Sequence, residues 1–215
     1  MTEPLTFIHR YLPPADASSP EGRVTLLLLH GTGGDEEDLL PLGRMLLPGA
    51  GLLSPRGQVL EHGMPRFFRR LAEGVFDQED LARRTTELAE FIAGAAAAYR
   101  LDPAGIIAVG FSNGANIAAS VLLRHPGRLR GAVLLSPMLP FEPETRPDLA
   151  GTQVLIGAGR SDPVVPPAQV ERLAQLLRES GATVTVRWDS GGHTITAGTV
   201  AAARGWLTAL GSGAW

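Results

Sequence analysis

The sequence contains no cysteine, which excludes disulfide bonds, a thiolate nucleophile and thiolate metal ligands. It also contains no lysine, since all 19 basic residues are arginine. The absence of lysine excludes Schiff-base chemistry, a Ser-Lys dyad and a phosphate-binding loop that depends on a lysine side chain. No apolar run approaches the roughly 20 residues of a membrane-spanning helix. The N-terminus also lacks the basic region and apolar run of a signal peptide. We therefore expect a cytoplasmic protein with no membrane span.

Charged residues are scarce and nearly balanced. They make up 19% of the chain, and 22 acidic against 19 basic residues give a formal net charge of −3. This balance offers no electrostatic surface for nucleic acid or for an anionic membrane. The length of 215 residues and the hydrophobic content of 44% are sufficient for one globular domain with a substantial core. We expect a single domain over residues 1–215.

Short apolar runs alternate with long helical patterns, which predicts an α/β fold with a mostly parallel, twisted sheet and helices on both of its faces. The run Val24–His30 is apolar almost throughout, as expected for a central strand buried on both faces. About seven strands are expected, at residues 5–11, 24–30, 52–54, 106–110, 132–136, 153–158 and 183–188. Helical spacing predicts one helix capped by Asp77, one over Pro167–Ser180 that stops at Gly181, and one over about 197–210.

Three connecting segments have features of their own. Asp35 and Asp38 are typical of an N-cap and its partner three residues later, for a helix through Leu39 and Leu40. The stretch Pro55–Phe76 has no clear pattern and is long enough that we expect it to form a wall of a site. Only 16 residues separate Ser136 from Gln153, too few for a helical cap domain.

The strongest chemical signal is the G-x-S-x-G motif at residues 110–114, placed between a buried strand and a helix that begins near Asn113. Glycine at both ends permits a tight, strained turn that projects Ser112 Oγ above the carboxyl edge of the sheet. The adjoining helix start supplies free backbone N–H groups where an oxyanion would develop. A glycine-rich turn with a capping serine is the alternative for this motif taken alone.

A second glycine-rich loop, His30-Gly31-Thr32-Gly33-Gly34, follows the central strand and resembles the loop that supplies a second oxyanion amide. The candidate donors are the backbone N–H groups of Thr32 and Asn113. We interpret His30 as a structural residue that fixes this loop by hydrogen bonds rather than as a catalytic one.

A serine nucleophile needs a histidine base, and that base needs an orienting carboxylate. Asp162 lies on the loop after the sixth expected strand, and His193 lies on the loop after the seventh. The order Ser112, Asp162, His193 suits a sheet of this kind. Asp189 is the competing acid, but its place four residues before His193 in the same loop is typical of a turn former. The other histidines are isolated and no metal-ligand spacing occurs, so we expect no metal and no cofactor.

Six motifs together resemble one family: H-G-T-G-G-D-E at 30–36, S-P-R-G at 54–57, R-F-F-R-R at 66–70, E-G-V-F-D at 73–77, G-F-S-N-G-A-N at 110–116 and D-P-V-V-P at 162–166. The chain resembles the small carboxylesterase/phospholipase branch of the α/β-hydrolase superfamily over roughly residues 24–210. Within that branch it is similar to bacterial carboxylesterases related to hydroquinone-linked hydrolases, near acyl-protein thioesterases and dienelactone-hydrolase-like esterases. The resemblance implies Ser112 as nucleophile, Asp162 as acid and His193 as base. The absence of cysteine separates the chain from dienelactone hydrolases proper, whose nucleophile is a thiol.

Three residues are candidates for substrate contact. Phe67 can contribute to an apolar acyl or aryl pocket, and Arg66 can meet a polar or anionic end of the substrate. The alternative is that the aromatic side chains of residues 66–70 anchor a long loop while the arginines are solvated. Phe111 neighbours Ser112 and either contacts substrate or packs beneath the turn.

These observations predict a serine carboxylesterase that hydrolyses small esters with a short acyl or an aryl group, through an acyl-enzyme. Its partner is a small-molecule ester, and its oligomeric state is left open, with a homodimer as one alternative. A thioesterase or lysophospholipase with the same three residues is a rival, and so is a catalytically silent binding module on the same fold. Haloalkane dehalogenation is disfavoured because serine stands where that chemistry uses aspartate.

Overall fold

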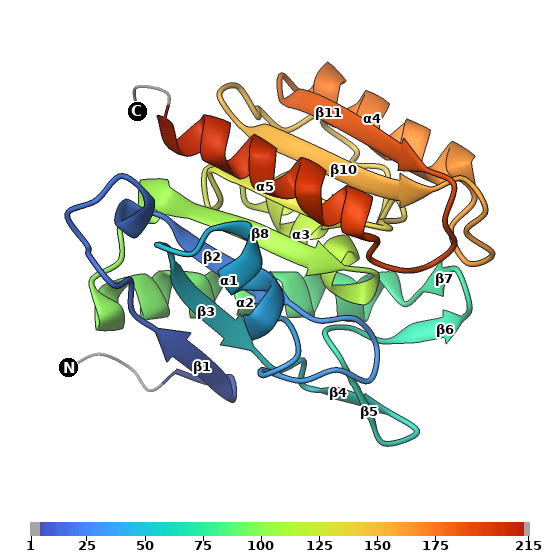
Figure 1. The fold of residues 1–215 in the computed structure, drawn as a ribbon. Helices are drawn as coiled ribbons and strands as arrows, with labels where there is room; N and C mark the ends of the chain where they lie inside the picture. The colour runs from blue at the N-terminus through green and yellow to red at the C-terminus, as the bar shows by residue number, and fades with distance from the viewer. Residues whose placement is uncertain (1–4, 213–215) are drawn as a thin grey trace.

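The computed structural model describes residues 5–212, which are built around one seven-stranded sheet (Figure 1). The strands of this sheet are β1 (His9–Leu12), β2 (Thr25–Leu29), β3 (Gly51–Pro55), β8 (Ile106–Phe111), β9 (Gly131–Leu135), β10 (Gln153–Gly159) and β11 (Thr183–Asp189). All seven expected strands are present. The largest difference is in β1, which begins at His9 rather than at Leu5.

The strand order is β1-β3-β2-β8-β9-β10-β11, and β1 is the one strand of this sheet that runs antiparallel to its neighbour. The expected mostly parallel sheet is therefore confirmed. Parallel neighbours need crossover connections, and these connections place helices on the two faces of the sheet. The carboxyl ends of β2, β8, β9, β10 and β11 consequently meet along one edge.

Five α-helices cover the sheet (Figure 1): α2 (Gln78–Tyr99), α3 (Asn113–Arg124) and α4 (Pro167–Glu179) on one face, and α1 (Leu40–Leu46) and α5 (Ala197–Ser212) on the other. Two short 3-10 helices lie at Glu21–Arg23 and Pro103–Gly105. Alternate leucines of β2 belong to different cores, with Leu27 facing α2, α3 and α4 and Leu28 facing α1 and α5. No helix within residues 5–212 is long and apolar enough to cross a membrane.

The helix caps agree with the sequence at two of three places. Asp77 caps α2 by accepting a hydrogen bond from the Asp80 N–H at 3.0 Å, and Gly181 follows α4 with a φ of +97°. The expected cap at Asp35 is wrong, because α1 begins at Leu40 and Asp35 instead accepts the Glu37 N–H in a turn. Pro41 explains the late start, since its ring would clash with a carbonyl group one turn earlier in a longer helix.

The stretch from Pro55 to Phe76 folds into two small hairpins outside the main sheet. They pair β4 (Val59–Glu61) with β5 (Met64–Arg66) and β6 (Arg70–Ala72) with β7 (Val75–Phe76). Strands of two or three residues are too short to show an alternating pattern, which explains why they were not expected. Residues 136–152 contain neither helix nor strand, so the expected absence of a helical cap between β9 and β10 is confirmed.

Gly114 permits the closest packing between the sheet and α3. A Cβ atom on Gly114 would lie 1.9 Å from the Leu29 carbonyl oxygen, and one on Gly110 would lie 2.5 Å from the Gly114 carbonyl oxygen. We expect Gly114→Val to lower the free energy of unfolding by at least about 1–3 kcal/mol, because the added side chain overpacks a dense interior. Gly205→Val in α5 is the matched control, since no atom lies within 4 Å of its Cβ position.

Denaturant unfolding of the two variants and the wild type at one pH measures this difference. Gly205→Val should leave stability unchanged or slightly higher, because valine is the better helix former. A Gly114→Val protein as stable as the wild type would contradict this account of the turn.

Candidate active site

Loops at the carboxyl ends of four parallel strands bring the predicted residues together. Thr32 follows β2, Ser112 follows β8, Asp162 follows β10 and His193 follows β11. The carboxyl edge of an open parallel sheet is where ligands bind in folds of this class. Residues separated by up to 161 positions in the chain (32 to 193) therefore share one site.

Ser112 occupies a strained turn between β8 and α3. Its φ of 52° and ψ of −114° lie in a backbone region that residues other than glycine rarely adopt. The turn is held on both sides, because the Ser112 N–H donates to the Leu135 carbonyl oxygen at 2.9 Å and the Ser112 carbonyl oxygen accepts from the Asn116 N–H at 2.9 Å. The sharp turn expected from G-x-S-x-G is therefore present.

A line of hydrogen bonds connects Ser112, His193 and Asp162. His193 Nδ1 lies 2.8 Å from Asp162 Oδ2, and His193 Nε2 lies 2.8 Å from Ser112 Oγ. A carboxylate only accepts hydrogen bonds, so the Nδ1 atom carries the imidazole proton. Nε2 is then the acceptor for the Ser112 hydroxyl proton. The hydroxyl group is thus placed beside a base that is ready to receive its proton.

The Asp162 carboxylate is buried and kept ionised by its partners. Its side chain is 1% exposed. Burial by itself raises the pKa of Asp162, but the Val165 N–H, the His193 ring and the Val164 N–H outweigh burial, so the pKa lies below its ordinary value. The two backbone N–H groups donate to Oδ1 at 2.9 and 2.8 Å, which leaves Oδ2 for the imidazole.

The competing aspartate, Asp189, makes no hydrogen bond to His193 within the described residues. Its Oδ1 atom accepts the Gly191 N–H at 2.7 Å, and its Oδ2 atom accepts the hydroxyl groups of Thr196 and Thr199 at 2.9 and 2.8 Å. These bonds close the loop on which His193 lies. Asp189 therefore forms a turn, as its position in the sequence suggested.

A narrow cavity of about 40 Å³ opens beside Ser112. Thr32 and Asn113, the residues predicted to supply oxyanion amides, both line it. Asn113 is the first residue of α3, so its N–H has no acceptor within the helix. A larger groove of about 610 Å³ lies beside Phe141 and includes none of the predicted site residues.

His30 holds the glycine-rich loop in place through both nitrogen atoms of its ring. Its Nδ1–H donates to the Gly31 carbonyl oxygen at 2.7 Å, and its Nε2 atom accepts the Gly57 N–H at 2.9 Å. Burial lowers the pKa of His30, which keeps the ring neutral and able to accept that bond. These contacts agree with the interpretation of His30 as a structural residue.

The three predicted substrate-contact residues occupy different environments. Arg66 is 3% exposed and lines the cavity. The Phe67 ring is buried against His30, with 4.7 Å between ring centroids, and Phe67 is not among the cavity-lining residues. The centroids of the Phe111 and His193 rings lie 5.2 Å apart. Of the two aromatic residues, Phe111 is the one in contact with the Ser112–His193 line.

Sequence reasoning missed most of the cavity wall. The residues that it did not single out are Arg70, Glu73, Gly74, Phe76, Asn116, Ser136, Met138, Val164 and Val165. Asn116 could have been found from the sequence, because it is part of the G-F-S-N-G-A-N motif. Its Oδ1 atom accepts the Met138 N–H at 2.8 Å. The hairpin residues confirm the expectation that the stretch Pro55–Phe76 forms a wall of a site.

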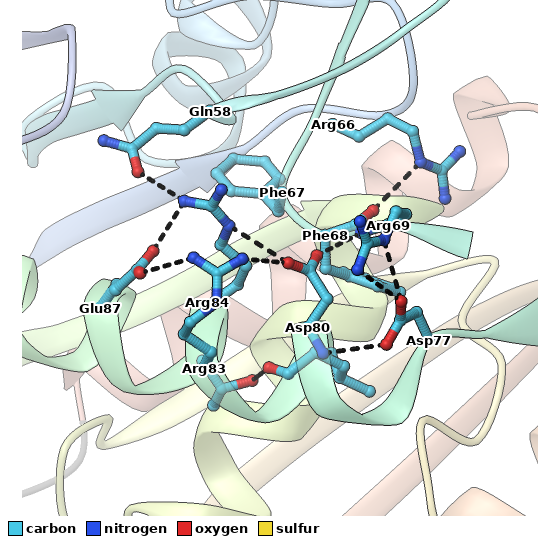
Figure 2. Close-up of polar contacts among 12 residues, drawn as sticks. Gln58, Arg66, Phe67, Phe68, Arg69, Asp77, Asp80, Arg83, Arg84 and Glu87 are labelled. Atoms are coloured by element: carbon cyan, nitrogen blue, oxygen red, sulfur yellow. Dashed lines mark hydrogen bonds and ion pairs between the residues drawn. The ribbon is translucent and has the colours of Figure 1, made fainter. Parts of the chain in front are cut away.

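The segment that links the two hairpins, residues 66–69, is anchored to the start of α2 (Figure 2). Asp80 Oδ2 accepts the Arg69 N–H at 2.7 Å, and Asp77 Oδ2 accepts the Arg69 Nε–H at 2.9 Å. Arg83 forms an ion pair with Asp80 Oδ1, and Arg84 lies 3.7 Å from the same oxygen. The Asp80 side chain is buried, and the two arginines compensate its negative charge.

The described residues contain no cluster of three or more histidine, aspartate or glutamate side chains that could hold a metal ion.

Comparison with known proteins gives consistent matches along nearly the whole chain. A family described as Phospholipase/Carboxylesterase matches residues 16–210. The Bacillus subtilis (strain 168) protein named "Putative hydrolase MhqD" is 53% identical over 181 residues, which are 84% of this chain and 90% of that protein. The crystal structure of the Bacillus cereus carboxylesterase is 48% identical, with a TM-score of 0.91 over 95% of this chain and 94% of that one. A carboxylesterase structure from Mesorhizobium loti is 38% identical, with a TM-score of 0.88 over 97% of each chain.

The strain at Ser112 can be measured through stability. We expect Ser112→Gly to leave the free energy of unfolding unchanged or to raise it, because glycine tolerates the positive φ that costs other residues about 1–3 kcal/mol. Ser112→Ala keeps the Cβ atom and is the matched control, since it removes the hydroxyl group without relieving the backbone. Denaturant unfolding compares both variants with the wild type. A loss of several kcal/mol in Ser112→Gly would show that the turn is not strained in this way.

Proposed function

The chain belongs to the phospholipase/carboxylesterase family of α/β-hydrolases, and from this premise we propose that it is a serine carboxylesterase of small esters. Ser112 is the nucleophile, His193 the general base and acid, and Asp162 the orienting carboxylate. The observation that carries the proposal is the pair of 2.8 Å contacts that join these three side chains in one line.

The reaction proceeds in two halves. In the first, Ser112 Oγ attacks the ester carbonyl carbon while its proton passes to His193 Nε2. The tetrahedral intermediate then collapses as the C–O bond to the alcohol breaks and His193 donates the proton to the leaving oxygen. In the second half, a water molecule gives one proton to His193 and its oxygen attacks the acyl carbon. The bond between that carbon and Ser112 Oγ then breaks, His193 returns the proton to Oγ, and the acid leaves.

Asp162 and the two loop amides stabilise the charges that this reaction creates. When His193 is protonated, the ionised Asp162 carboxylate lies 2.8 Å from Nδ1 and compensates the new positive charge. The N–H groups of Thr32 and Asn113 are the proposed donors to the oxyanion, because both residues line the cavity beside Ser112. The start of α3 adds the positive end of a helix dipole to the same place.

The size of the cavity favours a short acyl group. At about 40 Å³ the cavity is far smaller than the roughly 300–1,000 Å³ of typical ligand pockets, which favours an acyl group of few atoms. A thioesterase or lysophospholipase for long chains would need a long apolar groove beside Ser112. Phe111 remains a proposed substrate contact, since its ring lies against His193. Arg66 lines the cavity, but its Nε and Nη1 atoms donate to protein oxygens.

A catalytically silent binding module is the other candidate. Such a module would have no reason to keep a serine in a strained backbone conformation within hydrogen-bond distance of a histidine. The complete line of Ser112, His193 and Asp162 therefore supports hydrolysis over binding alone.

We expect Ser112→Ala and His193→Ala each to lower kcat by about 10⁴–10⁶-fold, and the double variant to be hardly worse than either, because the three residues act as a unit. Asp162→Asn should lower kcat by about 10³–10⁴-fold, since an amide favours the wrong imidazole tautomer. Asp189→Asn is the matched control at the other aspartate near His193, and its effect should be much smaller. Steady-state hydrolysis of a neutral aryl ester measures all of these values.

One outcome would count against the assignment. A larger loss in Asp189→Asn than in Asp162→Asn would make Asp189 the orienting acid.

Acyl length separates the esterase from its long-chain rivals. With 4-nitrophenol as the constant leaving group, we expect kcat/KM to fall by more than about tenfold between the butyryl and octanoyl esters, because a long chain cannot enter the cavity and displaces the reacting carbonyl group. A kcat/KM that rises with chain length would favour the lysophospholipase or thioesterase alternative.

A further inference from the structure

We propose that Arg66 is a positioning residue for the oxyanion site and acts through the hydroxyl group of Thr32. The inference rests on the proposed function, since it concerns the amides that would receive the oxyanion. It assigns a role to the hairpin segment 66–69, which joins the start of α2 to both amide-bearing loops.

Adjacent residues of this segment contact both loops directly. The Arg66 Nη1–H donates to Thr32 Oγ1 at 2.6 Å. The Phe67 N–H donates to Asn113 Oδ1 at 2.7 Å. Thr32 and Asn113 lie 81 positions apart in the chain, after different strands, and within the described residues no hydrogen bond joins them to each other. The segment therefore connects the two residues whose amides are the proposed oxyanion donors.

The side chain of Asn113 indicates how strongly this contact is required. Asn113 is 1% exposed, and its Nδ2 atom has no hydrogen-bond partner within the described residues. A buried unpaired N–H group destabilises a protein, because it loses its hydrogen bonds to water without replacement. Asn113 is thus held in an unfavourable environment in which its one satisfied polar atom is the acceptor for the Phe67 N–H.

The other end of the segment is attached to a long helix (Figure 2). Asp80 Oδ2 accepts the Arg69 N–H at 2.7 Å, and Asp80 lies in the first turn of α2, which is 22 residues long. The Arg66 Nε–H donates to the Phe68 carbonyl oxygen at 3.2 Å, which fixes the guanidinium plane against its own segment. The segment 66–69 therefore restricts the movement of Thr32, because its other end is bound to the long helix α2.

Protein groups hold the Arg66 side chain in position. Glu61 Oε2 lies 3.3 Å from Arg66 Nη1, and the same carboxylate is 2.9 Å from Arg70 Nε. The Nε and Nη1 atoms of Arg66 also donate to protein oxygens, so these contacts position the guanidinium group. Donors aimed at a developing charge are effective when they are held in place beforehand.

This role predicts a specific kinetic signature. Loss of the Arg66–Thr32 contact should lower kcat and the affinity for a tetrahedral adduct together, because both depend on the oxyanion amides. KM for a small neutral ester should change little. A residue that binds substrate would instead raise KM, and a residue that only stabilises the fold would change neither constant at a temperature well below Tm.

The experiment compares Arg66→Met, Thr32→Val and the double variant in the full-length protein. Thr32→Val removes Oγ1 and keeps the backbone N–H. Arg172→Met is the matched control, because Arg172 forms a two-point ion pair with Glu142 and lines no part of the cavity. For each protein, kcat and KM are measured on 4-nitrophenyl acetate, the inhibition constant on phenylboronic acid, and Tm by thermal unfolding.

We expect Arg66→Met and Thr32→Val each to lower kcat by about 10- to 100-fold, as small displacements of catalytic groups do, with a parallel loss of boronic acid affinity. The double variant should equal the worse single variant, because both remove the same contact. Arg172→Met should match the wild type. If Arg66→Met fails to fold, Thr32→Val decides the test alone, since it deletes one hydroxyl group.

Three results would overturn the inference. An unchanged kcat in either folded variant would show that the contact has no positioning role. Losses that multiply in the double variant would show that Arg66 does not act through Thr32. A raised KM with an unchanged kcat would make Arg66 a substrate-binding residue. An inactive wild type that a fluorophosphonate probe fails to label would instead overturn the proposed function, and the inference with it.

Discussion

The contact between α3 and the end of β2 is the constraint on which the rest of the site depends. Gly114 brings the first turn of α3 against the carbonyl groups of Leu29 and His30, where no side chain would fit. This contact fixes the start of α3 beside the glycine-rich loop, directly after Ser112 with its positive φ. Thr32 from one loop and Ser112 and Asn113 from the other then line one cavity. Asn113 connects that cavity to the segment between the hairpins through the Phe67 N–H.

Two aspartates near His193 have different roles: one contacts the imidazole ring, and the other contacts the backbone of the same loop. Asp162 uses both oxygens, one for backbone N–H groups and one for the imidazole, so its position and its charge are both determined. Asp189 closes the loop that carries His193 through Gly191 and two threonine hydroxyl groups. The histidine is thus oriented by one carboxylate, while the backbone beneath it is shaped by the other.

Much of the fold could be predicted because the sheet is buried on both faces and its strands are long enough to show this in the sequence. The residues Ser112, Asp162 and His193 could be placed near one another for the same reason, since each follows a recognisable strand. The hairpin strands could not be predicted, because two or three half-exposed residues carry no periodicity. The start of α1 differs from the prediction because Pro41, in the first turn of the helix, opposes the longer helix that the aspartate pattern predicts. The partners of Arg66 depend on tertiary contacts across 34 positions, which no local pattern records.

The two hairpins pair only with themselves and share no strand ladder with the main sheet. The turns at their tips, residues 62–63 and 73–74, are exposed. These turns can therefore be exchanged, lengthened or shortened without shifting the register of any strand that leads to Ser112, Asp162 or His193. Because the same hairpins form part of the cavity wall, substrate choice can differ between relatives while the reacting groups stay in place.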